Sequence, residues 1–315
     1  MNPIVLKITL SLSLALFPFT VWSASIWAPG VSFDNGWVDV NKAWDAKDSD
    51  MCWAASASNV LEWWQTLYAS AGNILPENAP SGFVSGKEDA TVRQYQIFDY
   101  FLENWANAGG KSYNAIPWYL SGGFIADSYY KDGASRLVEG ADSAGFFKNL
   151  YPNASSLAYV RSGAWAGDFG IYWYTWDKSS TTKYYYSTYE GFSSLLIESF
   201  QKQSVVSATV SFSGGAHAIT FWGCEYTDDN LVTAVYFTDS DDNMLSLRTV
   251  RLSGDDNGIY LDGYLNGKTA TISAFNAFSA ASIPNIGSII PEPSTFGLFA
   301  GVAALTLVSA RRRRK

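Results

Sequence analysis

The change of hydrophobic pattern along the chain is the feature that most constrains its fold. Residues from Cys52 to about Ala69 are rich in Ala, Leu, Glu and Trp without Gly or Pro, which predicts a long helix. Apolar residues at helical spacing predict a second helix over about 92–106. Beyond residue 205 the chain becomes a series of short β-branched and aromatic runs separated by Gly, Asp and Asn. Helices followed by antiparallel strands predict an α+β domain.

The individual elements can be placed from the same pattern. The expected strands lie at 205–212, 217–226, 231–238 and 245–252, near residue 260 and at 270–274. A further helix fits 191–201. The Gly-, Ser- and Tyr-rich middle, 109–187, shows no clear pattern except for aromatic runs at 172–174 and 184–186 that could be strands. Residues 48–50 precede the first helix and are of types that commonly cap a helix N-terminus.

The N-terminus has the pattern of a secretory signal peptide. Lys7 is followed by an apolar run from Ile8 to Val21 and then by the small residues 23–25. The run is shorter than the roughly 20 residues of a membrane-spanning helix, which favours a removed signal over a membrane anchor. We therefore expect residues 1–24 to be a signal peptide and the protein to be exported.

The C-terminus has three successive parts. Pro291-Glu292-Pro293 precedes an apolar stretch at 294–310, and the basic residues 311–315 end the chain. The stretch is at the short end of a spanning helix, and a basic cluster behind it would stay cytoplasmic. This order resembles the PEP-CTERM sorting signal of exopolysaccharide-producing Gram-negative bacteria, and a plain C-terminal anchor is the alternative.

The PEP-CTERM resemblance implies how residues 286–315 would be handled. An exosortase-type sorting enzyme would be a partner, and the apolar helix would be inserted transiently in the inner membrane. The mature protein would then lie at the cell surface, in the outer envelope or outside the cell, and would be membrane-anchored before processing.

The remaining region, 25–285, has the length and apolar content of one large domain. The whole chain carries a formal net charge of −8 although Lys7 and residues 311–315 are basic, so this region is more acidic still and a nucleic-acid partner is disfavoured.

It contains one histidine and lacks zinc-ligand spacing and a Gly-rich phosphate loop, so we expect no metal and no cofactor. Two cysteines are too few for a disulfide scaffold, and a Cys52–Cys224 bridge competes with a free reactive thiol.

Cys52 is a candidate nucleophile because it stands at the start of the first expected helix. The positive end of the helix dipole and unpaired backbone N–H groups favour a thiolate there, although Asp48 and Asp50 nearby oppose it. His217, the only histidine, follows the small residues 213–216 and begins an apolar strand. A Cys–His pair in this chain must use it. A buried structural cysteine and a histidine that caps a loop are the alternatives.

An acidic segment follows the strand that ends near Phe237. If Asp239 and His217 lie at comparable ends of neighbouring strands, the Asp239 carboxylate could accept the Nδ1–H of His217, which would fix the tautomer and stabilise the imidazolium. An ordinary Asp/Asn turn and a weak calcium loop are the alternatives. Cys224 lies seven residues after His217, and strand alternation places the two on opposite faces, so we interpret it as a buried core thiol.

The order and the residues of these motifs resemble those of the immunoglobulin-degrading IdeS/Mac-type cysteine proteases, a branch of the papain-like superfamily. The segments that carry the resemblance lie at 36–42, 47–55, 59–64, 217–223 and 236–241, and they read GWVDVNK, KDSDMCWAA, NVLEWW, HAITFWG and YFTDSD. They cover the two ends of the domain in the order Cys, His, Asp. The middle, about 75–187, does not align.

The resemblance implies a papain-like fold, with the nucleophile on an N-terminal helix packed on a C-terminal antiparallel sheet. It implies Cys52 as nucleophile, His217 as base and acid, and Asp239 as the residue that orients the histidine. Asp241 would support this network, and Lys42 would contribute to the oxyanion hole, where a cation can meet the charge that develops on the scissile carbonyl. Trp53 departs from the family, in which small residues follow the nucleophile, and this bears on the shape of the cleft.

The expected activity is hydrolysis of peptide bonds in an extracellular protein through an acyl-enzyme on Cys52, with immunoglobulin-like proteins among the candidate substrates. Two alternatives keep the papain-like shell. One is a non-catalytic, surface-sorted envelope or matrix protein, and the other is a transpeptidase or deamidase. The recognition surfaces of the family fall in the part that does not align, so the sequence leaves the substrate open.

Overall fold

A computed structural model gives the structure of the chain. It describes residues 23–43, 45–88, 93–122, 137–138, 144–151, 171–176, 185–242, 244–265 and 267–289. Nearly all of the expected signal peptide and of the expected C-terminal sorting segment, including the apolar stretch 294–310, lies outside these residues. None of the helices in the described ranges combines the length and apolar character needed to cross a membrane.

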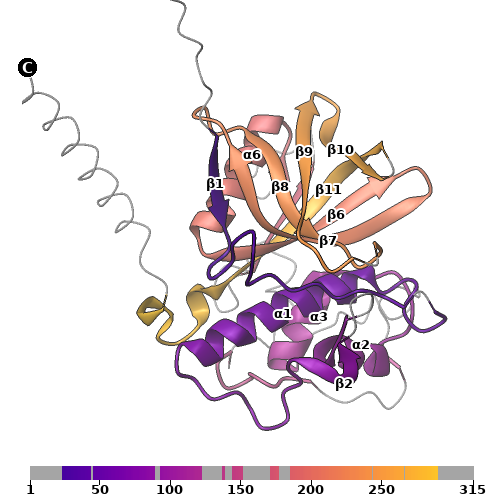
Figure 1. Cartoon of the computed structure of the whole chain (residues 1–315), viewed down its shortest axis with the longest axis vertical. Coiled ribbons are helices and arrows are strands. Elements are labelled where there is room, and N and C mark those ends of the chain that lie inside the picture. The colour runs from indigo at the N-terminus through magenta and orange to yellow at the C-terminus, as the bar shows by residue number, and fades with distance from the viewer. Residues whose placement is uncertain are drawn as a thin grey trace, which may run out of the picture.

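The C-terminal half forms a closed antiparallel barrel (Figure 1). Each strand pairs with the next and the last returns to the first, so the ring has no open edge. Its members are β6 (Ser204–Phe212), β7 (Gly215–Tyr226), β8 (Val232–Thr238), β9 (Arg248–Asp255), β10 (Gly258–Leu265) and β11 (Lys268–Ser279). The sequence predicted antiparallel strands here, and the structure shows that they close on themselves rather than forming an open sheet.

Three further strands extend the barrel. β1 (Ala24–Trp27) pairs antiparallel with β7, and β4 (Ile171–Trp176) pairs antiparallel with β11. β5 (Tyr185–Tyr186) runs parallel to β4. The two aromatic runs of the middle region are therefore strands, as their pattern suggested.

The N-terminal half forms a helical layer against one end of the barrel (Figure 1). It consists of α1 (Cys52–Ser70), α2 (Gln96–Asn104) and α3 (Ser112–Ser121), with a small hairpin of β2 (Phe83–Glu88) and β3 (Arg93–Tyr95). α1 packs on α2 and α3 and also on β6 and β7, which explains why it is buried on nearly every side. Outside this layer lie α6 (Tyr189–Gln201) and two 3-10 turns, η1 (Ala280–Ser282) and η2 (Ile286–Ser288).

The helix at 52–69 is confirmed to within one residue, but the helix expected at 92–106 is wrong at both ends. Residues 93–95 are extended because they pair with β2, and α2 then runs only over 96–104. The sequence pattern missed α3 altogether. Pro117, a residue that lacks the backbone N–H donor of a regular helix, lies inside α3 and hid the helical pattern.

The helix expected at 191–201 begins two residues earlier, at Tyr189, where the side chain of Thr188 accepts a hydrogen bond from the Gly191 N–H at 3.0 Å. The strand expected at 245–252 is β9, shifted to 248–255. The loop before β9 is longer than expected because the Met244 N–H donates to the Asp242 carboxylate at 2.9 Å and prolongs the turn.

A buried polar network fixes α1 on the barrel. The Ser56 hydroxyl lies 2.7 Å from that of Ser207 in β6 and 3.0 Å from that of Thr220 in β7. Asn59 donates to Thr220 at 3.1 Å and to Thr238 in β8 at 3.3 Å. Residues 52, 56 and 59 share one face of a helix, so these contacts also set the position of Cys52. Leaving one such buried partner unpaired costs about 1–3 kcal/mol, which makes slippage of the helix unfavourable.

Candidate active site

Cys52 is the first residue of α1, where the positive end of the helix dipole lies. The expected capping by residues 48–50 is wrong: the N-cap is Met51, and no side chain caps the helix. Asp48 instead closes the preceding loop by accepting the N–H groups of Ala43 at 2.5 Å and Asp45 at 3.1 Å. The amide end of α1 is therefore left to act on Cys52.

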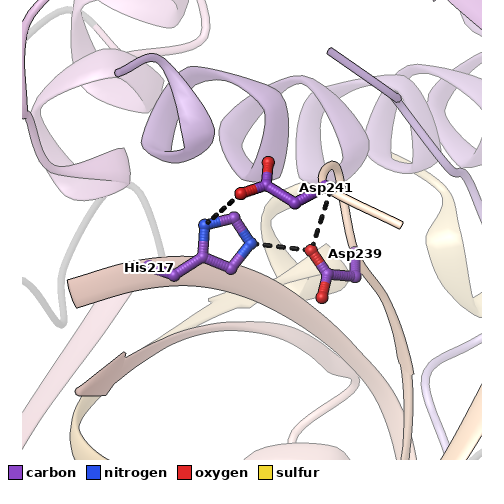
Figure 2. Close-up of side chains that lie close together, drawn as sticks. All are labelled: His217, Asp239 and Asp241. Carbon is purple, nitrogen blue, oxygen red and sulfur yellow. Dashed lines mark hydrogen bonds and ion pairs between the residues drawn. The ribbon is translucent and has the colours of Figure 1, made fainter. Parts of the chain in front are cut away.

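His217 and Asp239 meet as the sequence predicted. His217 lies near the start of β7, Asp239 follows β8, and the two strands pair antiparallel. The Asp239 Oδ1 atom lies 2.7 Å from Nε2 of His217 (Figure 2). The expected contact with Nδ1 is wrong, because the imidazole points Nε2 toward the end of β8 and Nδ1 toward Asp241.

Asp241 and Lys42 add a second ion pair to the site. The Asp241 Oδ2 atom lies 3.3 Å from Nδ1 of His217, and its Oδ1 atom lies 2.9 Å from Nζ of Lys42. Lys42 is buried and also donates to the Ser49 carbonyl at 2.7 Å, just before Cys52. Its backbone N–H donates to the Ser240 carbonyl at 2.9 Å. Lys42 thus ties the loop after β8 to the loop before α1.

Tyr264 and Arg248 complete the surroundings of Asp239, and sequence reasoning missed both. The buried Tyr264 hydroxyl donates to Asp239 Oδ2 at 2.6 Å. Arg248 lies 3.8 Å from the same oxygen and 3.1 Å from Asp242 Oδ2, with its guanidinium over the ring of Phe237. Arg248 lies in β9, which pairs with β8, and Tyr264 lies in β10, which pairs with β9, so their closeness to Asp239 follows from the pairing of these strands. No local motif marks them.

The environment of Cys52 favours the thiolate. Burial by itself opposes ionisation, but the hydrogen bond and charge of His217, the Ala218 N–H and the charge of Lys42 outweigh it and lower the pKa of the Cys52 thiol. The Cys52 thiol and the His217 imidazole are hydrogen-bond partners, while Nε2 of the same ring faces Asp239 and Nδ1 lies 3.3 Å from Asp241 Oδ2.

The imidazole is stabilised in its charged form. Burial opposes the charge, but Asp239 and Cys52 outweigh burial through hydrogen bonds and charge and raise the pKa of His217 to about 10. Burial likewise works against the Asp239 carboxylate, yet its contacts with His217 and Tyr264 and the Asp241 N–H hold the pKa of Asp239 below its ordinary value. The lowered pKa of Cys52 and the raised pKa of His217 together favour a thiolate–imidazolium pair.

These side chains line a cavity of about 560 Å³ between the helical layer and the barrel. Cys52, His217, Lys42 and Asp241 all border it, and its other walls include Trp53, Phe212 and residues 109–111 and 214–216. A larger cavity of about 680 Å³ lies between α2 and the 43–48 loop and contains none of the five candidate residues. Of these two cavities in the described part of the chain, the smaller one is lined by both Cys52 and His217, which makes it the candidate reaction site.

Trp53, the bulky residue after Cys52, is one of the residues that line this cavity, but its indole makes its contacts in the helical layer. It is 1% exposed, donates to the Ala108 carbonyl at 2.9 Å and packs against Trp105 in the helical layer.

Cys224 is a buried free thiol and Cys52 is free as well, so the structure contains no bridge between them. Burial raises the pKa of the Cys224 thiol, in keeping with an inert core residue.

His217, Asp239 and Asp241 also place ligand atoms within 4.8 Å of one another, close enough to hold a metal ion. These ligand atoms already have partners within the protein: the Asp239 carboxylate contacts His217 and Tyr264, and the Asp241 carboxylate contacts Lys42. Asp242 is paired with Arg248, so the carboxylates of this loop already face protein cations or N–H and O–H donors. This pairing favours an orienting role for the loop over the calcium-loop alternative.

Removal of the Tyr264 hydroxyl should destabilise the fold through Asp239. In Tyr264→Phe the buried carboxylate loses a charge-assisted hydrogen bond, so we expect the free energy of unfolding in urea to fall by about 1.5–3 kcal/mol. Tyr260→Phe is the matched control, because its hydroxyl donates to Asp255 at 3.0 Å on the exposed surface and its loss should change nothing measurable. Equal changes in the free energy of unfolding in the two variants would show that the buried Tyr264–Asp239 hydrogen bond stabilises the fold no more than the exposed Tyr260–Asp255 bond does.

Comparisons with known proteins place this site in a family context. Residues 160–272 match the family model Mac-1, described as "Mac 1", and this range includes His217, Asp239 and Asp241. The chain is also 26% identical over 237 residues to a protein of Streptococcus suis (strain P1/7) named "IgM protease". That match covers 71% of this chain and 19% of the relative, so the chain spans about a fifth of the relative's length. The two matches support an IdeS/Mac-type family and, at the level of the family, a cysteine protease-like function.

Proposed function

We propose that this protein is a cysteine endopeptidase in which Cys52 is the nucleophile and His217 the general base and acid. The observation that carries the proposal is the chain of contacts from Cys52 to His217 to Asp239, which borders an open cavity. The nucleophile stands at a helix N-terminus and the base at a strand end, the arrangement expected for a papain-like layout. The family matches support the same reaction class.

The reaction begins with attack of the Cys52 thiolate on the scissile carbonyl carbon. The C–N bond then breaks, and His217 gives its proton to the leaving amine, which leaves a thioester on Cys52. Water attacks the thioester carbonyl while His217 takes a proton from the water, the C–S bond breaks, and the second product departs as a carboxylic acid, which restores the Cys52 thiolate and the protonated His217. Asp239 keeps the imidazole oriented throughout and stabilises its charged form.

Lys42 is the proposed cationic donor for the oxyanion. Its ammonium lines the same cavity as Cys52, and its charge contributes to the low pKa of the thiol. The Nζ atom lies between Asp241 and the Ser49 carbonyl, which holds a cation beside the start of α1. An oxyanion formed next to Cys52 would develop its charge near this cation and near the amide end of the helix.

The proposed substrate is an extracellular protein. This rests on the export signals expected at residues 1–24 and 286–315 and on the Streptococcus suis relative, whose name states immunoglobulin M as its target. Sorting by an exosortase-type enzyme, with transient insertion of residues 294–310 in the inner membrane, remains part of the proposal, as does a final place at the cell surface or outside the cell. The net charge of −8 disfavours a nucleic acid as the binding partner and is compatible with a protein substrate.

The proposal is tested by cleavage of a panel of denatured proteins together with native immunoglobulin M. Wild type should produce new peptide termini, and Cys52→Ala should produce none. Cys224→Ala is the matched control, since that thiol is buried away from the cavity and its loss should leave cleavage intact. Mass spectrometry of the products separates hydrolysis, which creates new termini, from deamidation, which does not. Cleavage that persists in Cys52→Ala would contradict the proposal.

A further inference from the structure

A second cavity adjoins the first at His217. It has a volume of about 520 Å³, and Cys52 does not line it. His217, Phe212 and Asp241 border both cavities, whereas Met244, Arg248 and Tyr264 border only the second. The two spaces therefore meet at the imidazole, with the nucleophile on one side only.

The chemistry of acyl transfer assigns different parts of a substrate to the two cavities. The acyl part bonds to the nucleophile and stays beside it, while the leaving amine must reach the acid that protonates it. The leaving segment of the chain therefore passes over the imidazole and away from the cysteine. We infer that the second cavity is the subsite for the first residue after the cleaved bond and that it selects an apolar side chain there. This inference rests on the proposed function.

The apolar preference follows from what faces the cavity. Phe212 is 36% exposed and Met244 is 45% exposed, and they are among the few large hydrophobic side chains left exposed in the described residues. Covering them with an apolar substrate side chain removes their surface from water. Phe212 is the last residue of β6 and pairs with Gly215 of β7. Met244 donates its N–H to Asp242 at 2.9 Å and its carbonyl accepts from Asn41 Nδ2 at 3.0 Å, so its backbone is held at both groups.

The charged side chains of the cavity do not set up a competing preference. Arg248 is paired with Asp242 at 3.1 Å, Asp241 with Lys42 at 2.9 Å, and Asp239 with His217 at 2.7 Å. Each cation is thus balanced by a neighbouring carboxylate, and a charged substrate residue gains no unpaired partner. Gly263 leaves room on the floor, since a Cβ atom added there would meet nothing within 4 Å.

The test is digestion of a proteome-derived peptide library by wild type and by three variants. Wild type should favour apolar residues at the first position after the cleaved bond. Met244→Lys should reduce that preference about tenfold and shift it toward Asp and Glu, because the lysine ammonium disfavours an apolar neighbour and can pair with a carboxylate; a single methylene in an apolar pocket already changes discrimination by about 10- to 200-fold. Met244→Leu should retain the wild-type preference. Ile74→Lys, a change at an apolar residue that is 89% exposed and far from both cavities, is the matched control and should alter nothing.

Each other outcome overturns the inference. An unchanged preference after the cleaved bond in Met244→Lys, or a change that appears only before the bond, would show that the leaving segment does not occupy this cavity while leaving the proposed function intact. If wild type cleaves no peptide of the library, the proposed function fails and the subsite assignment falls with it. A shift in Ile74→Lys equal to that in Met244→Lys would trace the effect to surface charge.

Discussion

Replacing His217 with alanine should slow alkylation of Cys52 by iodoacetamide at pH 6 by at least about 100-fold. Burial opposes the thiolate, and His217 is the foremost of the groups that outweigh burial. Without it the thiol should titrate at or above its ordinary pKa of about 8.5, where well under about 1% is ionised at pH 6. The wild-type rate should instead stay nearly constant from pH 6 to pH 8 if the proposed thiolate–imidazolium pair is formed over that range, in keeping with the lowered pKa of the Cys52 thiol.

Two variants guard this result. His217→Gln keeps an amide that can donate to Asp239 but carries no charge, so it should show the same loss and exclude mere disruption of the fold. Cys224→Ala should react like wild type, because the Cys224 thiol is buried and its pKa is raised. If His217→Ala reacts as fast as wild type, the thiolate does not depend on the imidazole and the proposed pair is wrong.

Replacing Lys42 with methionine should lower kcat/KM by about 100- to 1,000-fold, the usual effect of removing one oxyanion donor. The same change removes the lysine from the Asp241 carboxylate, which is 22% exposed and keeps its contact with His217, and leaves the Ser49 carbonyl without this donor. Loss of one partner of a buried ion pair costs about 3–5 kcal/mol, and we expect the lower end because Asp241 reaches solvent. Urea unfolding and steady-state kinetics measure the two effects.

The two roles of Lys42 can be separated. Adding Asp241→Asn to Lys42→Met removes the carboxylate charge that lost its lysine. The double variant should therefore regain much of the free energy of unfolding but not the activity. Lys47→Met changes an exposed lysine of the neighbouring loop and should alter neither quantity. If Lys42→Met retains wild-type kcat/KM, Lys42 holds the loops together without acting on the reaction.

The sequence predicts the parts of this fold that depend on local pattern. The helix that begins at Cys52 and the strands that carry His217 and lead to Asp239 stand where the pattern places them, because each is a continuous run with one period. α3 was missed because Pro117 breaks the local signal while the helix is held by packing in the helical layer. The hairpin at residues 93–95 likewise depends on a partner strand that no local pattern reveals.

The candidate site divides in the same way. Cys52, His217 and Asp239 carry local signals, a helix start, a lone histidine at a strand end and an acidic turn. The Lys42–Asp241 ion pair and the Tyr264 hydroxyl do not, since their partners are brought together only by the pairing of β8, β9 and β10 and by the contact of the loop before α1 with the loop after β8. The choice of Nε2 over Nδ1 for Asp239 also depends on the rotamer of one side chain, which sequence reasoning cannot supply.

The most direct test of the Cys52–His217 pair is a thiolate titration by ultraviolet absorbance near 240 nm, taken as the difference between wild type and Cys52→Ala. If Cys52 and His217 form the proposed thiolate–imidazolium pair, the absorbance of one thiolate is already present at pH 7 and changes little as the pH rises to 8.5; a lowered pKa of the Cys52 thiol agrees in direction. His217→Ala should lose this absorbance at pH 7. A difference signal that is absent at pH 7 and develops only above about pH 8.5 in wild type would contradict the assignment of Cys52 as an activated nucleophile.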